Sequence, residues 1–151
     1  MARLLIAVLF LSLLAAGCSV PSSDERAVKE AVRKYNQLLA EGYARMEMEP
    51  LLEVAGKEEF SRVLHHMIAL REAKLRLESH LTKLDFSSIT MTDARTARVT
   101  TREVWDFTQV GVGSGATNLQ ARDVIHLLSY DLAKNGDKWL VKRVTPLDAA
   151  K

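Results

Sequence analysis

Hydrophobic residues change their spacing along this chain, and each spacing predicts a different element. Residues 4–14 form an almost unbroken apolar run. Between Val28 and Leu75, apolar residues recur at intervals that are typical of amphipathic helices. From Leu81 onward they alternate with polar residues, as strands with one buried face do. Helices followed by a run of strands predict an α+β domain.

Three helices are predicted in the first half of the chain. The first spans 24–45, and Ser22 and Glu25 have the spacing of a capping box at its start. Its apolar stripe favours docking onto a sheet over lying on a membrane. A short second helix is expected at 50–56. A third, with a broad apolar face, is expected at 57–79.

Four strands are predicted in the second half of the chain, at 84–91, 97–109, 119–133 and 138–144. The glycine-rich segment 111–115 lies between the second and third strands. It lacks the Lys-Ser/Thr ending of a phosphate-binding loop, and no helical pattern follows it. We therefore interpret it as a hairpin loop.

One face of the second strand must point inward, because it carries the aromatic residues. That face consists of Val99, Thr101, Glu103, Trp105 and Phe107. The dipeptide Asn135-Gly136 is a strong hairpin signal. A two-residue turn there places Leu132 opposite Trp139 and Leu128 opposite Arg143.

Two stretches of the predicted sheet resemble a known family. They are 97–105, with Ala97-x-Val99, and 130–141, with Tyr130-x-Leu132 followed by Trp139-x-Val141. Both resemble the NTF2-like superfamily, in particular its ARC6-like (IMS) branch, and the resemblance covers roughly 24–146. It implies a cone in which N-terminal helices lie across a curved antiparallel sheet of about four strands and leave a hollow.

Candidate site residues follow from the inner face of this cone. The core face or hollow is expected to include Tyr35, Trp105, Tyr130, Trp139 and Arg143. Glu103 and His126 are the candidate catalytic residues, since a carboxylate and an imidazole can form a general acid–base pair. The structural alternative is a buried Glu103 paired with Arg143, His126 or a backbone amide. A ligand-orienting role for Glu103 stays open as a third interpretation.

Neither a metal nor a cofactor is predicted. His65 and His66 are adjacent, so on a helix they point about 100° apart and cannot share a metal ion. His80 is expected far down the same helix axis. Solvated helix histidines are the simpler interpretation.

The N-terminal segment indicates where the protein works. Arg3, the apolar run and the small residues before Cys18 form a signal-peptide pattern, and the run is too short to cross a bilayer. The segment resembles the lipobox of bacterial lipoproteins, although Ala15 stands where that family usually has Leu. It implies lipidation of Cys18, with palmitate-type acyl chains. The alternative is ordinary secretion with a free thiol at Cys18. Ser19 favours the outer membrane, facing the periplasm.

These observations divide the chain into a signal peptide (1–17), a lipidated tether (18–23), one NTF2-like domain (24–146) and a tail (147–151). The whole chain has 21 basic and 19 acidic residues, a formal net charge of +2. Removal of 1–17 takes one base, leaving 20 and 19, so nucleic acid is not an expected partner.

The favoured function is a non-enzymatic binding or assembly module of the cell envelope, tethered to a membrane through its lipid. It would hold a protein partner or a small apolar ligand, and a chaperone-like subunit of an envelope complex is one form of it. Homodimerisation is a further expectation. The alternative is a small isomerase or hydrolase-type enzyme that uses Glu103 and His126.

Overall fold

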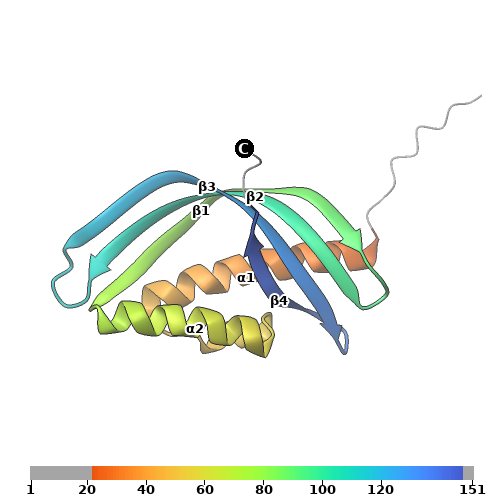
Figure 1. Cartoon of the computed structure of the whole chain (residues 1–151), viewed down its shortest axis with the longest axis horizontal. Coiled ribbons are helices and arrows are strands. Elements are labelled where there is room, and N and C mark those ends of the chain that lie inside the picture. Colours follow the sequence, from red (N-terminus) through yellow and green to blue (C-terminus); the bar gives the residue numbers. More distant parts are fainter. Residues whose placement is uncertain (1–21, 148–151) are drawn as a thin grey trace, which may run out of the picture.

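The computed structural model describes residues 22–147, which form two helices packed against one curved sheet (Figure 1). In chain order the elements are α1 (Ser23–Arg45), the short 3₁₀ helix η1 (Glu49–Glu53), α2 (Lys57–Glu72), β1 (Leu75–Met91), β2 (Thr96–Gly111), β3 (Thr117–Asn135) and β4 (Lys138–Pro146). The strands pair in sequence order, and each pair is antiparallel. The predicted α+β cone is confirmed. The predicted signal peptide and Cys18 lie outside the described residues.

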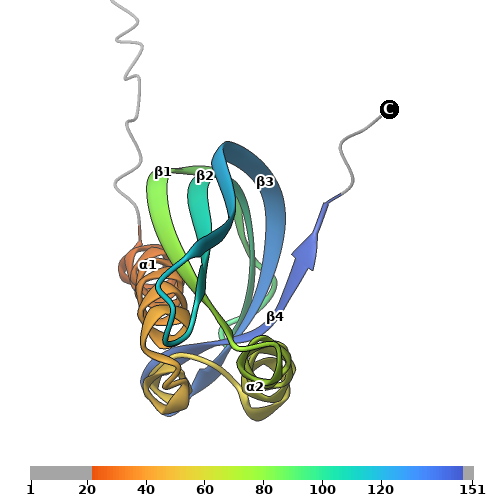
Figure 2. The ribbon, with the colours of Figure 1, turned by 90° about the vertical axis from the view of Figure 1, so that its left-hand side faces the viewer.

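The strands bend over the helices, so that the sheet forms an arch (Figures 1 and 2). Pairing of β1 with β2 shifts register between Leu81 and Lys83 and again between Phe86 and Ser88. Pairing of β2 with β3 shifts between Trp105 and Phe107. Bulges of this kind bend a strand and increase its twist. The extra residues at these shifts lie in β1 and β3, the two strands that flank β2, and they account for the bend of the arch.

Helix α1 begins and ends as its sequence predicts. The Ser22 side chain accepts a hydrogen bond from the Glu25 amide, which caps the first turn. Met46 follows the last turn in the left-handed region, with φ of 61°. Within residues 22–147, neither α1 nor any other helix combines the length and apolarity that a membrane crossing requires.

Helix α2 is shorter than the predicted 57–79, and this prediction is corrected. It ends at Glu72, and Lys74 then adopts a left-handed φ of 55°. Leu75 and Leu77 belong to β1, where they pair with Gly111 and Gln109. The spacing Leu75-x-Leu77 fits a strand, and the neighbouring strand outcompetes continuation of the helix. His80 consequently lies on β1 and not on a helix.

The β3–β4 hairpin has a different register from the predicted one. The loop residues are Gly136, at a positive φ of 59°, and Asp137, and Asn135 pairs with Lys138. Trp139 therefore lies opposite Lys134 instead of Leu132. The observed partner of Trp139 lies two residues from the predicted one. Since side chains alternate between the faces of a strand, a displacement by two residues leaves Trp139 pointing inward as predicted.

A second irregularity in β4 moves Arg143 out of the predicted core face. Leu132 pairs with Val141, but its neighbour Asp131 pairs with Arg143, so Lys142 is an extra residue between them. One extra residue reverses the faces of the residues after it. Arg143 is accordingly exposed beside Asp131, which also pairs with Arg98. The sequence carries no turn signal at this bulge.

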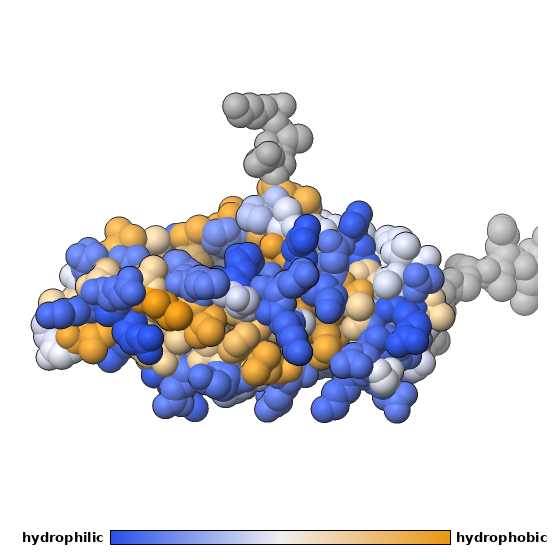
Figure 3. Space-filling view, turned by 60° about the horizontal axis from the view of Figure 1, so that its bottom comes forward, coloured by the Kyte–Doolittle hydropathy of each residue, from blue (hydrophilic) through white to orange (hydrophobic). Residues whose placement is uncertain are grey.

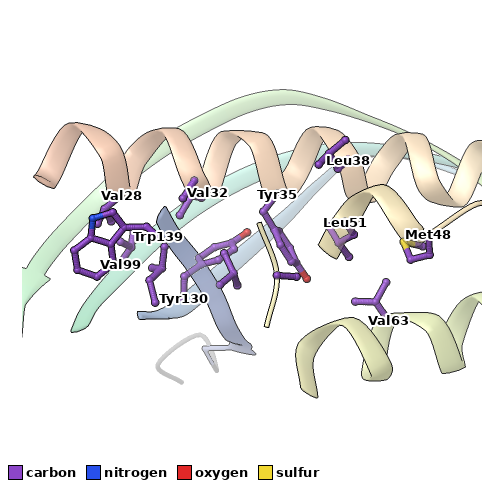
Figure 4. Packing of buried hydrophobic residues seen from close by; sticks show 14 of the residues in the cluster. Val28, Val32, Tyr35, Leu38, Met48, Leu51, Val63, Val99, Tyr130 and Trp139 are labelled. Atoms are coloured by element: carbon purple, nitrogen blue, oxygen red, sulfur yellow. The ribbon is translucent and has the colours of Figure 1, made fainter. Parts of the chain in front are cut away.

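The hydrophobic core lies between the sheet and the helices α1, η1 and α2 (Figure 4). Val28 and Val32 of α1 pack near Trp139 and Val99, whereas Leu51 and Met48 pack near the other end of α1. The segment after η1 is fastened to the edge of β4. The Gly56 amide donates to the Val141 carbonyl at 2.8 Å, and the Val141 amide donates to the Val54 carbonyl at 2.7 Å.

Candidate functional site

A cavity of about 290 Å³ lies inside the cone, lined by residues from α1, α2 and all four strands. Most of its walls are hydrophobic or aromatic, and hydrophobic surface runs along the middle of the helix-bearing face in Figure 3. Its aromatic lining consists of Tyr35, Tyr43, Trp105, Phe107 and Tyr130. Trp105 and Phe107 stack with their ring centres 5.9 Å apart and their planes inclined by 13°. An apolar hollow with a few polar groups is the usual form of a small-molecule site.

Glu103 borders this cavity, yet none of its surface is exposed to solvent. Its Oε1 accepts hydrogen bonds from Asn36 Nδ2 (3.0 Å), Thr101 Oγ1 (2.9 Å) and Tyr130 Oη (2.6 Å). Its Oε2 accepts one from Trp105 Nε1 (2.8 Å). The single Tyr130 hydroxyl hydrogen has two acceptors within reach, Glu103 Oε1 and, at 3.1 Å, Asn36 Oδ1. Directed at the nearer one, Glu103 Oε1, it completes four donors around an ionised carboxylate. Because Asn36 belongs to α1, Thr101 and Trp105 to β2, and Tyr130 to β3, the buried carboxylate connects these three elements.

A second buried carboxylate, Glu59 of α2, has a different set of partners. It accepts hydrogen bonds from the Tyr35 hydroxyl, from the Val144 amide and from two nitrogens of Arg62. The Arg62 side chain is itself 60 % exposed, whereas that of Glu59 is 1 % exposed. Glu59 is thus a buried charge paired with a cation, which is the usual arrangement in proteins.

The tyrosines of the site are held in their neutral form. Burial, reinforced by the neighbouring Glu103, raises the pKa of Tyr130 well above its ordinary value. Burial and Glu59 likewise raise the pKa of Tyr35. Burial raises the pKa of Tyr43 to about 12. The Tyr43 hydroxyl forms a hydrogen bond of 2.7 Å with His66 Nδ1, and the tautomer of His66 sets which of the two groups donates.

The structure brings several of the predicted site residues together. Glu103, His126, Tyr35, Trp105 and Tyr130 all border the cavity. Glu103 and His126 are opposite one another on β2 and β3. However, the four side chains that bind Glu103 do not include His126. The His126 ring instead lies in a T-shaped arrangement with Phe107, with the ring centres 5.8 Å apart.

The other two predicted residues lie away from this cavity. Trp139 is buried in the core at the opposite end of the cone. Arg143 is on the outer face. Neither it nor a backbone amide is among the partners of Glu103, so the buried and paired carboxylate that the sequence suggested exists with different partners.

Three side chains that line or support the cavity were not predicted from the sequence: Asn36, Glu59 and Arg62. Asn36 sits between apolar residues on the buried side of α1, and a polar residue on such a stripe is a usable signal for a buried partner. Glu59 lies in the first turn of α2, where an acid is already explained by the helix dipole. Within residues 22–147, no group of three or more His, Cys, Asp and Glu side chains is arranged to hold a metal ion.

Comparison with known proteins gives similarity of fold without similarity of sequence. No protein-family model and no curated protein sequence matches the chain. Among solved structures, the intermembrane space region of the chloroplast protein ARC6 has a TM-score of 0.69 at 19% identity, over 85% of this chain and 100% of that one. A periplasmic fragment of TraM has a TM-score of 0.56 at 10% identity, over 80% and 98%.

An enzyme-like structure also shares the fold. The ketosteroid isomerase-like protein from Erwinia carotovora atroseptica has a TM-score of 0.53 at 11% identity, over 82% of this chain and 96% of that one. Identities this low show the fold alone. The chain itself has two helices across an open, curved four-stranded sheet. Together with this topology, the neighbours support the NTF2-like fold.

Proposed function

We propose that this chain is a non-enzymatic binding module of the cell envelope, and that its cavity holds an apolar ligand. The observation that carries the proposal is the lined hollow between the helices and the sheet. Filling such a hollow with an apolar group removes hydrophobic surface from water, and this contributes about 25 cal/mol for each Å² buried.

The state of Glu103 favours binding over catalysis. A general base must come within hydrogen-bond reach of the proton that it removes. Here the Glu103 carboxylate already accepts four hydrogen bonds and has no exposed surface. It therefore serves better to hold the walls of the cavity in position than to exchange protons with a substrate.

Location in the envelope forms part of the same proposal. The lipobox-like segment supplies an acyl anchor at Cys18, and Ser19 favours the outer membrane with the domain facing the periplasm. The ARC6 and TraM structures come from an intermembrane space and a periplasm, which is compatible with that location. A protein partner, or a second copy of the chain, would then be met in the same compartment.

Ligand binding is tested with a matched pair of variants on α1. Ala40 lines the cavity, whereas Ala44, one turn further on, is not among the lining residues. We expect Ala40→Leu to abolish binding of decanol, measured by the change in tryptophan fluorescence, because the added atoms fill the hollow. Ala44→Leu should bind decanol as the unmodified chain does. Equal binding by both variants, or no binding by the unmodified chain, would contradict the proposal.

The enzyme alternative has its own signature. Turnover of a bound ligand that is abolished by Glu103→Gln and also by His126→Ala would support an isomerase or hydrolase.

The anchor is tested separately with Cys18→Ser, which should release the protein from membranes or leave the precursor uncleaved. Mass spectrometry of the N-terminal peptide should show acyl chains on Cys18, and an unmodified thiol in the mature protein would overturn the lipoprotein proposal.

A further inference from the structure

The two buried carboxylates of the cone differ in one respect that points to a ligand. Glu59 is paired with the guanidinium of Arg62 through two hydrogen bonds, of 3.0 and 2.5 Å. Glu103 has only neutral donors around it, and none of the ion pairs within residues 22–147 includes it. A charge that is removed from water normally has a countercharge nearby. In the part of the chain that the structure describes, no cationic side chain lies within ion-pair distance of Glu103.

The charge on the cavity wall is consequently negative. Apart from tyrosines, the ionisable residues that line it are Arg62, His66, Glu103 and His126. The positive charge of Arg62 is balanced by Glu59, to which it is bound. With the histidines counted as neutral, the charge that remains is that of Glu103. Inside a low-dielectric hollow such a charge acts over a longer distance than it would in water.

The aromatic lining adds a second attraction of the same sign. The faces of tryptophan and tyrosine rings attract cations, and the attraction is larger when water is excluded. Trp105 stacks on Phe107 and also donates its Nε1 hydrogen to Glu103, so the aromatic wall and the carboxylate are directly joined. A positive group against this wall would interact favourably with both.

The hydrogen bonds of Glu103 restrict what kind of cation fits. Oε1 already accepts three hydrogen bonds and Oε2 accepts one, and neither atom is exposed. Because neither oxygen is exposed, a primary ammonium in the cavity would lose hydration without a hydrogen bond to Glu103 in return. A quaternary ammonium carries its charge on alkyl groups and needs no acceptor. Its alkyl surface also matches apolar walls.

We infer that the cavity selects an apolar ligand that carries a quaternary ammonium group, attracted by Glu103 and held against the Trp105 wall. This inference rests on the proposed function, because it names the ligand class of the same cavity.

Three probes of equal chain length test the inference on the unmodified protein: decyltrimethylammonium, decanol and decanoate, each kept below its micelle concentration. Binding is followed by tryptophan fluorescence and confirmed by calorimetry. We expect decyltrimethylammonium to bind tighter than decanol by about tenfold or more, and decanoate to bind most weakly. This ranking does not depend on any variant folding.

A charge-neutral variant then locates the effect. In Glu103→Gln the affinity for decyltrimethylammonium should fall to the affinity that the same variant has for decanol, so that the preference for the cation is lost. Glu58→Gln is the matched control, because it removes the same charge from an exposed position on α2. The control should retain the full preference for the cation.

The outcomes separate this inference from the proposed function. Equal binding of all three probes, or tighter binding of decanoate, would overturn the quaternary ammonium inference and leave an apolar ligand site. A preference that Glu103→Gln retains would likewise overturn it. Absence of binding by every probe would overturn the proposed function and this inference with it.

Discussion

The two ends of the cone use the same sheet face in different ways. At the end where α1 begins, Val28, Val99 and Trp139 fill the space between helix and sheet. At the other end, Trp105 and Phe107 face a hollow. The change coincides with the end of β4.

The length of β4 explains this difference. It pairs with only the last part of β3, up to the pair of Leu128 with Pro146, and both of these residues line the cavity. Beyond them the sheet continues with three strands, β1, β2 and β3. One continuous inward face of the sheet thus packs against the core over half its length and lines the cavity over the other half.

The largest expected effect is at the filled end. Trp139→Ala should lower the free energy of unfolding by about 3–5 kcal/mol, because it leaves a cavity in a close-packed core. Domains of this size have about 5–15 kcal/mol in total, so much of the stability would be lost. Denaturant unfolding measures the change. An unaltered transition midpoint would break the assignment of this end as the filled one.

A matched pair of leucines on β3 sharpens the comparison. Leu132 is buried in the core, whereas Leu128 is only partly buried and lines the cavity. We expect Leu132→Ala to cost about 2–5 kcal/mol. Leu128→Ala should cost less, about 1 kcal/mol, because the side chain has a void beside it and loses fewer contacts. Similar losses for both variants, measured by the same unfolding experiment, would mean that the two ends are equally packed.

Variants of Glu103 probe the polar centre between the two ends. Glu103→Leu leaves four buried donors without their acceptor, and each such group costs about 1–3 kcal/mol. Relaxation and water will offset part of this sum, so we expect a net loss of about 2–3 kcal/mol. Glu103→Gln keeps an oxygen for the three donors at Oε1 and should lose about 1 kcal/mol. If Glu103→Leu were more stable than the parent, a structural role for this carboxylate would be excluded.

A small effect at neutral pH, about 1 kcal/mol, is expected from Tyr43→Phe, which removes the hydrogen bond to His66 at the hollow end. The variant acts differently at high pH. The folded-state pKa of Tyr43 is raised to about 12, so its contribution is fully present below the unfolded-state pKa of about 10 and is lost as the pH rises through about 12.

The alkaline loss of stability is therefore measurable site by site. Between about pH 10 and 12, each such tyrosine should lower the unfolding free energy by about 1.4 kcal/mol per pH unit. Tyr43→Phe should remove one such contribution from the slope, with those of Tyr35 and Tyr130 remaining. An unchanged slope in urea titrations across this range would show that Tyr43 titrates alike in both states.

Local patterns were sufficient for the class of fold and for most elements. The cap at Ser22, the inward face from Val99 to Trp105 and the burial of Trp139 depend on neighbours in sequence, on side-chain alternation or on aromatic content. The boundary between α2 and β1 was not predictable in the same way. Leu75 and Leu77 fit either element, and only the presence of β2 alongside decides between them.

In the candidate site, too, some features follow from local sequence and others only from the tertiary structure. By itself the sequence determined that Glu103 would lie among apolar residues on the inner face of a curved sheet, because side chains alternate along a strand. Only the tertiary structure decided its partners. Asn36 and Tyr130 come from elements 67 and 27 residues away, and the bulge at Lys142 turns Arg143 outward. A buried charge depends on what surrounds it in space, and that surrounding is set by helix docking and strand register, which no local pattern records.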